Sequence, residues 1–248
     1  MKQMKFFLVA LMAVMSVTFT SCLNGESNPI VQVGEIVRAN YMGNFTNQFN
    51  MKLVPTNSTD IYTGNMYYIV YEYDSSTITS NTTSVDITLF AATCVDGPSV
   101  HSTSVTANAP IYGFNTQGYE IPRFFDENTL VIPFFYWFKE ETDETKHKAE
   151  MDKHSFILYY DHDAIKETDT ELNFYLVHQI NETEPTERLK YTGDFKTYNL
   201  SGAIADFKGV TGKVPSKIIV NAKTNNISNT LDNANNGKIT LEYKSKSE

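Results

Sequence analysis

The feature that most constrains the fold of this chain is the alternation of inward-facing and outward-facing residue types in short runs. Between Glu171 and Ile180, every second residue from Leu172 onward is apolar or aromatic up to a histidine near the end. Successive side chains of a β-strand point to opposite faces, so this period of two predicts a strand with one buried face. The same pattern occurs at Tyr67–Tyr73 and at Gly237–Tyr243. The sequence therefore predicts an all-β fold.

The predicted strands fall into two groups that are separated by a change in composition. Residues 96–118 are rich in turn-forming types, which places a domain boundary near residues 108–118. Four or five short strands precede the boundary, and they suit a small β-barrel over residues 31–110. About seven antiparallel strands follow it, and they suit a β-sandwich over residues 111–248. The one helix expected lies in Lys139–Lys153, which is rich in Glu, Lys and Ala.

The first 22 residues predict export from the cytoplasm. Two lysines precede an apolar run, Phe6–Phe19, that is shorter than the about 20 residues needed to cross a bilayer. Small residues then lead directly to Cys22, an arrangement that resembles a bacterial lipoprotein signal. On this interpretation residues 1–21 are removed, Cys22 is lipidated, and residues 22–30 form a flexible tether. The alternative is a secretory signal with an incidental cysteine.

Charge and cysteine content narrow the classes of partner. The formal net charge is −9, and it becomes −11 when residues 1–21 and their two lysines are removed. An acidic chain argues against nucleic acid or anionic lipid as a partner, because both reward a basic surface. Cys94 would then be the single remaining thiol. Its strand-like surroundings predict a small buried side chain rather than a reactive one.

The densest group of side chains that could bind a metal lies between residues 147 and 163. His147, His154 and His162 could hold zinc if the fold brought them together. Their spacing lacks the pair of histidines four residues apart that a helical zinc-protease site requires, and a solvated, charged insert explains the same residues. The sequence contains no nucleophile elbow, phosphate-binding glycine loop or dinucleotide motif. We therefore expect no enzymatic activity, no cofactor and no metal.

Aromatic side chains are the remaining candidates for contact with a ligand. The sequence has 15 Tyr, 16 Phe and one Trp, and most of them occupy alternating strand positions that are expected in the core. Tyr112, Tyr119 and Trp137 are the candidates for exposed ligand-binding residues, with Tyr62 behind them. His178 lies on the apolar face of its strand, so we expect a hydrogen-bonded core histidine rather than a ligand-binding one.

The order of these segments resembles the NigD-like lipoproteins of Bacteroidetes. The resemblance rests on the signal that ends at Cys22, the Tyr-rich strand Tyr67–Tyr73, the apolar strand that ends in Phe134–Phe138, and Leu172–Gln179 followed by a polar loop and Tyr191–Leu200. It implies an N-terminal OB-like β-barrel followed by a C-terminal antiparallel β-sandwich. It implies no catalytic residues.

We therefore expect a non-enzymatic lipoprotein of the cell envelope that acts as a binding or assembly module for another envelope protein. Cys22 would anchor it to the outer membrane, on either the periplasmic or the surface side. The alternative is a glycan-binding accessory lipoprotein of a polysaccharide-uptake system. Exposed coplanar aromatic rings flanked by Asn and Asp would favour a glycan, whereas a convex apolar patch or an unpaired strand edge would favour a protein.

Overall fold

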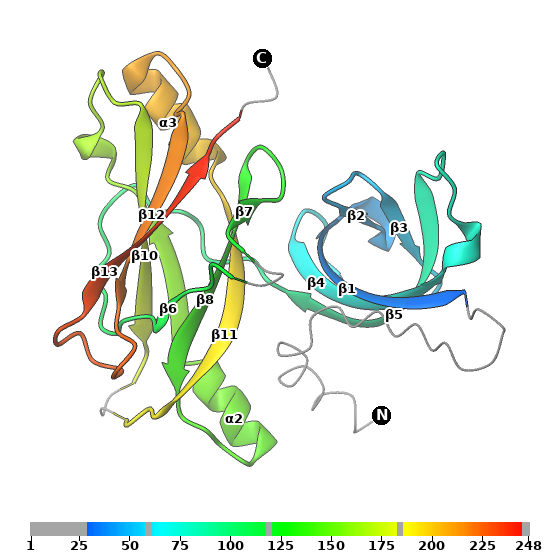
Figure 1. The fold of residues 1–248 in the computed structure, drawn as a ribbon, viewed down its shortest axis with the longest axis horizontal. Helices are drawn as coiled ribbons and strands as arrows, with labels where there is room; N and C mark the ends of the chain where they lie inside the picture. Colours follow the sequence, from blue (N-terminus) through cyan, green and yellow to red (C-terminus); the bar gives the residue numbers. More distant parts are fainter. Residues whose placement is uncertain (1–28, 58–60, 118–120, 183–185, 245–248) are drawn as a thin grey trace. The chain divides into compact units, whose positions relative to one another are not determined.

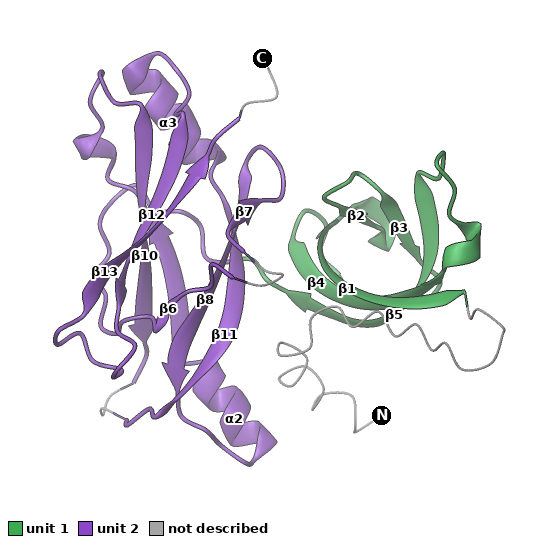
Figure 2. Cartoon of the chain, viewed as in Figure 1, with its two compact units in different colours: residues 1–96 green, residues 97–248 purple. Residues whose placement is uncertain are grey.

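The computed structural model describes residues 29–57, 61–117, 121–182 and 186–244. The chain divides into two compact units, Met1–Asp96 and Gly97–Glu248 (Figure 2). Each unit has a hydrophobic core of its own. The expected signal peptide, Cys22 and most of the expected tether lie outside the described residues.

The first unit is a closed five-stranded barrel (Figure 1). Its strands are β1 (Ile30–Ala39), β2 (Phe45–Asn47), β3 (Lys52–Pro55), β4 (Met66–Asp74) and β5 (Ser84–Cys94), with short 3-10 turns η1 (Tyr41–Gly43) and η2 (Ser75–Thr77). The order around the barrel is β1-β2-β3-β5-β4, and β4 pairs back with β1 to close it. β3 and β5 run parallel, whereas the other neighbouring strands run antiparallel.

The alternation seen in the sequence fills the barrel interior. Val85 and Leu89 of β5 are buried, as the period of two predicts. The pairing register of β4 with β5 shifts between Val70 and Tyr71, which marks a bulge just beyond Leu89. Cys94 is exposed, so its predicted burial is wrong. The reason is its position, because it is the last residue of β5 and lies beyond Leu89, where the buried face of that strand ends.

The second unit begins at Gly97 rather than at residue 111, where the sequence places it. The turn-rich segment after Gly97 belongs to the second unit because its backbone bonds to strands of that unit. The Gly97 N–H donates to the carbonyl of Thr197 (2.9 Å), and the His101 N–H donates to the carbonyl of Leu158 (3.0 Å). Composition reveals a segment without regular structure, but it does not show which domain that segment joins.

The second unit contains two β-sheets (Figure 1). Its strands are β6 (Gly113–Phe114), β7 (Arg123–Phe124), β8 (Thr129–Phe138), β9 (His154–Tyr159), β10 (Glu171–Ile180), β11 (Lys190–Asn199), β12 (Lys217–Thr224) and β13 (Asn235–Glu242). One sheet has the order β13-β12-β10-β9, and the other has the order β11-β8-β6 with β7 also paired to β8. β10 and β12 run parallel, unlike the antiparallel arrangement expected, because the chain visits the other sheet as β11 before it returns as β12.

Two helices accompany these sheets. α2 (Glu144–Met151) confirms the predicted helical segment, and it begins after Asp143, whose carboxylate accepts a hydrogen bond from the backbone of Lys146. α3 (Ser201–Thr211) was not predicted, and it ends at Gly212, whose φ of 75° is in the left-handed region. A 3-10 turn, η3 (His162–Ala164), precedes β10. Within the described ranges, no helix has the length and apolar content needed to cross a bilayer.

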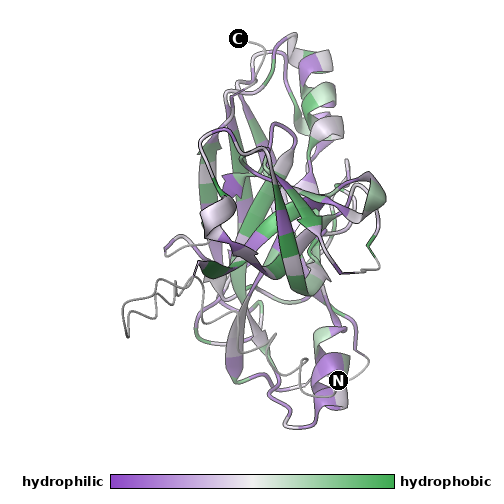
Figure 3. Cartoon of the chain, turned by 90° about the vertical axis from the view of Figure 1, so that its right-hand side faces the viewer, coloured by the Kyte–Doolittle hydropathy of each residue, from purple (hydrophilic) through white to green (hydrophobic). Residues whose placement is uncertain are grey.

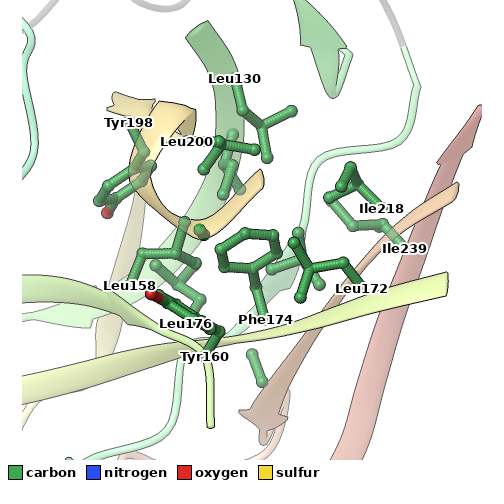
Figure 4. Close-up of a cluster of buried hydrophobic side chains, with 14 of the residues drawn as sticks. Leu130, Leu158, Tyr160, Leu172, Phe174, Leu176, Tyr198, Leu200, Ile218 and Ile239 are labelled. Atoms are coloured by element: carbon green, nitrogen blue, oxygen red, sulfur yellow. The ribbon is translucent and has the colours of Figure 1, made fainter. Parts of the chain in front are cut away.

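The two sheets and α3 share one hydrophobic core (Figure 4). Phe134 of β8 packs across it against Phe156 of β9, with ring centroids 4.3 Å apart. Phe174 of β10 and Phe207 of α3 are fully buried in the same cluster. Apolar and polar residues alternate visibly along the strands (Figure 3). One face of each sheet is therefore committed to the core, and any binding site in this unit must use the other face, a loop or an edge.

Candidate functional site

Two of the predicted ligand-binding residues, Tyr112 and Trp137, lie side by side in the second unit. Trp137 is on β8 and is paired with Tyr191 of β11. Tyr112 precedes β6, and its backbone N–H donates to the carbonyl of Phe135 on β8 (2.8 Å). The ring centroid of Tyr112 is 5.3 Å from that of Trp137 and 4.3 Å from that of Tyr191. These rings form one aromatic cluster on the side of β8 that faces away from the shared core.

Only part of this cluster is accessible. Trp137 is 8% exposed, and its indole N–H donates to the backbone carbonyl of Asn225 (2.8 Å). The expectation that Trp137 is exposed is therefore wrong, because Tyr112, Tyr191 and Asn225 surround it. Tyr191 is 53% exposed and stacks on Tyr112 with an interplanar angle of 24°. The ring that faces solvent is Tyr191, which the sequence analysis did not single out.

The loop that follows β12 contacts the cluster through the carbonyl of Asn225, and two residues later it carries an exposed aliphatic side chain, Ile227. Asn225, whose carbonyl binds Trp137, is buried and holds the loop with its side chain. Its Nδ2 donates to Ser228 Oγ (3.0 Å) and to the carbonyl of Thr230 (2.9 Å), and its Oδ1 accepts from the backbone of Ile227 (3.0 Å). Ile227 is nevertheless 86% exposed. The loop therefore presents a large apolar side chain from a fixed backbone.

Leu189, at the start of the segment that leads into β11, is a second exposed aliphatic residue. It is 71% exposed and lies two residues before Tyr191. Its neighbour Arg188 is buried, and Nε of Arg188 donates to Oε1 of Glu150 (2.7 Å). The same guanidinium makes two parallel bonds to the carboxylate of Glu182 (3.0 and 2.8 Å), so the chain is anchored immediately before Leu189. We use the name Tyr191 surface for the stacked pair Tyr112 and Tyr191 together with the exposed residues Leu189 and Ile227 on the adjoining segments.

The ion pair at Glu150 continues into two buried histidines. His154 Nε2 is 3.4 Å from Glu150 Oε1, and His154 Nδ1 is 2.8 Å from His178 Nε2. His178 Nδ1 is 2.9 Å from the carbonyl of Pro110, which can only accept, so this nitrogen carries the proton. Burial lowers the pKa of His154 to about 4 and that of His178 to about 3, and the charge of Arg188 acts in the same direction on both. The prediction that His178 is a hydrogen-bonded core residue is confirmed.

The three histidines considered for zinc do not meet. His154 belongs to the buried network above, whereas His147 packs edge-on against Phe138 with ring centroids 5.9 Å apart. His162 Nδ1 is 3.5 Å from a carboxylate oxygen of Asp206 in α3. Over the ranges that the structure describes, no group of three or more His, Cys, Asp or Glu side chains is placed to hold a metal ion.

The other candidates from the sequence lie elsewhere. Tyr62 belongs to the first unit, where its side chain is exposed and its backbone N–H donates to the hydroxyl of Tyr67 (3.0 Å). Tyr119 and Cys22 lie outside the described residues. Of the predicted set, Tyr112 and Trp137 are the pair that the described part of the second unit places in contact.

Comparison with known proteins places the chain in a family. No protein-family profile and no curated protein matches the sequence. A crystal structure of a protein named a "putative lipoprotein" from Bacteroides fragilis matches with a TM-score of 0.77 and 31% identity, over 87% of this chain and 99% of that one.

Two other solved structures share the fold alone. A protein of unknown function, DUF1344, from Bacteroides vulgatus matches with a TM-score of 0.53 and 10% identity, over 87% of this chain and 92% of its own. An uncharacterized protein from Parabacteroides merdae matches with a TM-score of 0.52 and 12% identity, over 86% and 99%. On the strength of the first comparison, the chain belongs to the same family as the Bacteroides fragilis protein.

Proposed function

We propose that this protein is an outer-membrane lipoprotein, anchored through Cys22, that binds another envelope protein and catalyses no reaction. The name of the Bacteroides fragilis relative supports the lipoprotein part of the proposal. The short apolar run and the small residues before Cys22 support it independently. Membership of the NigD-like lipoproteins belongs to the same proposal and rests on the order of the segments.

We also infer that the barrel is OB-like and that the second unit is a β-sandwich. The strand order β1-β2-β3-β5-β4, with β3 parallel to β5, supports the first assignment. Two sheets that share one core support the second.

The Tyr191 surface is the observation that carries the proposal of a protein partner. Leu189, Tyr191 and Ile227 are large, apolar or aromatic, and more than half exposed. Burying such side chains against a partner contributes roughly 1.5–3 kcal/mol for each aliphatic residue, and tyrosine is enriched at the centres of protein interfaces. The hydrogen bonds of Arg188 fix the backbone just before Leu189, and those of Asn225 fix the loop that carries Ile227. These two segments therefore lose little conformational entropy when a partner binds.

A glycan is less well supported than a protein at this surface. Stacking on a sugar needs an open aromatic face. Trp137 is buried, and the face of Tyr112 that meets Tyr191 is covered, so only Tyr191 offers an open ring. The other exposed members of the surface, Leu189 and Ile227, have aliphatic side chains that cannot bond to hydroxyl groups.

Affinity capture with the full-length, tagged lipoprotein tests this proposal. The variant Leu189→Ser/Tyr191→Ser/Ile227→Ser should lose the companion protein that the parent retains from solubilised envelopes. Tyr62→Ser is the control, because it removes a tyrosine of the other unit that is even more exposed than Tyr191, and it should keep the companion. Retention of the same companion by the triple variant, or recovery of none with the parent, would contradict the proposal.

A further inference from the structure

The outer face of the β13-β12-β10-β9 sheet carries a row of side chains that the proposed function does not use. Cross-strand pairing aligns Tyr159 of β9 with Tyr175 of β10, Tyr175 with Asn221 of β12, and Asn221 with Lys238 of β13. Phe174 is in the core, so its neighbour Tyr175 points to the opposite side of the sheet. From this row and its surroundings, we infer that the outer sheet face is a binding site for an oligosaccharide chain.

The aromatic part of the site is Tyr175. Its ring stacks on Tyr159 with centroids 4.9 Å apart and an interplanar angle of 19°. Because β10 lies between β9 and β12, the ring face that Tyr159 leaves uncovered is the one toward β12 and Asn221. Tyr175 is 37% exposed. Stacking on Tyr159 thus fixes the orientation of the Tyr175 ring, and the other face of that ring is available to the C–H face of a sugar.

Neutral amides and a lysine lie next to this ring. An open groove of about 520 Å³ is lined by Asn173, Asn221, Lys223 and Asn236 together with Tyr175. Lys223 Nζ donates to Oδ1 of Asn236 (2.8 Å), and Asn221 Nδ2 donates to the carbonyl of Phe174 (3.2 Å), so three of these side chains are already oriented. Amides both donate and accept, which suits the hydroxyl groups of sugars.

Hydrogen bonds within the protein fix one wall of the groove, so this wall is preformed. The segment 105–109 runs along β10, and Gln179 Nε2 donates to the carbonyl of Thr106 (2.7 Å). The side chain of Asn108 makes two bonds to the backbone of Ile180 (2.9 and 2.7 Å). Two alanines, at positions 107 and 109, face the groove and leave it open. A preformed groove lowers the entropic cost of holding a chain.

The charge and polarity of the residues that line the groove favour a sugar over an apolar peptide as its ligand. Among the described residues that line the groove, none is Asp or Glu, although the whole chain carries a formal net charge of −9. Aliphatic residues also line the groove, but Leu176, Val177 and Ala222 are buried. The exposed groups are mainly amides, a lysine and the Tyr175 ring, so an apolar protein segment gains little there. A chain of pyranose rings fits this chemistry, whether its sugars are neutral or carry a carboxylate that meets Lys223.

Isothermal titration calorimetry on the mature chain tests the inference with two sets of probes. Neutral oligosaccharides of glucose, mannose and xylose form one set, and oligogalacturonate forms the acidic set. At least one probe should bind, and Tyr175→Ala should weaken its binding by about tenfold or more. Tyr175→Phe keeps the ring and should bind as the parent does. If the acidic probe binds, Lys223→Gln should weaken it selectively, and if only neutral probes bind, Asn221→Ala should weaken those.

The controls separate this site from the Tyr191 surface and from misfolding. Tyr191→Ala should leave oligosaccharide binding unchanged. The proposal of a protein partner and the proposal of a sugar site can therefore be tested independently. Urea unfolding of Tyr175→Ala shows whether its loss of binding is caused by unfolding. Tyr175→Phe keeps the ring and the packing on Tyr159, so it tests the site even if Tyr175→Ala does not fold. Absence of heat with every probe, or equal affinity of Tyr175→Ala and the parent, would overturn the inference.

Discussion

Two buried, uncharged histidines predict that the second unit loses stability in mild acid. Burial holds the pKa of His178 at about 3 in the folded protein, whereas its ordinary value is 6.5. Between these values the unfolded chain binds a proton that the folded chain does not. The stability that the neutral ring contributes is therefore complete above pH 6.5 and is lost progressively as the pH falls.

The magnitude follows from the two pKa values. Between about pH 7 and about pH 5, His178 alone lowers the free energy of unfolding by about 2 kcal/mol. His154, with a pKa of about 4, contributes in the same direction. The two contributions are not fully additive, because a proton on one ring makes a proton on the other more costly. The hydrogen bonds that hold the pKa of Glu150 at about 2 matter only at lower pH, where its ordinary value of 4.5 is approached.

Fluorescence of Trp137 during urea unfolding measures this effect in the second unit alone, because the chain has one tryptophan and it lies on β8. The loss of unfolding free energy on acidification should be smaller by about 2 kcal/mol in His178→Gln than in the parent. His101→Gln removes an exposed histidine and should behave as the parent does. An equal loss in His178→Gln and the parent, or a parent equally stable at both pH values, would refute the reasoning.

Replacing Arg188 with Met should destabilise the second unit by about 3–5 kcal/mol, because Glu150 would keep a buried charge without its main partner. Urea unfolding followed by Trp137 fluorescence measures this loss, and a loss below about 1 kcal/mol would be inconsistent with a tight ion pair. Cys22→Ser should move the protein from carbonate-washed membranes into the soluble fraction, whereas a variant that stays in the pellet would disprove the anchor. Cys94 should react with a thiol reagent in the folded protein, and protection until unfolding would contradict its exposed position.

Local patterns predicted the strands well, and long-range pairing limited the rest. The alternation around Phe174 identified β10 with its buried face, and the Glu- and Lys-rich segment identified α2. β8 and β9 follow one another along the chain, yet β8 pairs with β11 and β9 pairs with β10. A helix between two strands allows them to join different sheets, and their sequences alone do not show which one each joins.

The candidate sites show the same limit. Tyr112 and Trp137 were found from residue type, but the burial of Trp137 depends on Tyr191 and on the loop at Asn225, which are remote in sequence. Tyr175 stands in an otherwise ordinary alternating strand, and only its pairing with a second tyrosine and an asparagine marks it. α3 escaped notice because Gly202 and Gly209 lower its helix propensity by about 1 kcal/mol each relative to alanine, and packing of its apolar face compensates.

The parallel pairing of β10 with β12 affects the order in which the second unit can fold. β10 can join β9 as soon as both have been made, but its other edge stays open until β11 and α3 have been completed and β12 has returned. Pairings between strands so far apart along the chain form slowly, and an uncovered apolar edge invites association with other unfinished chains. The interval before β12 arrives is therefore the stage at which a folding molecule is most prone to associate with other unfinished chains.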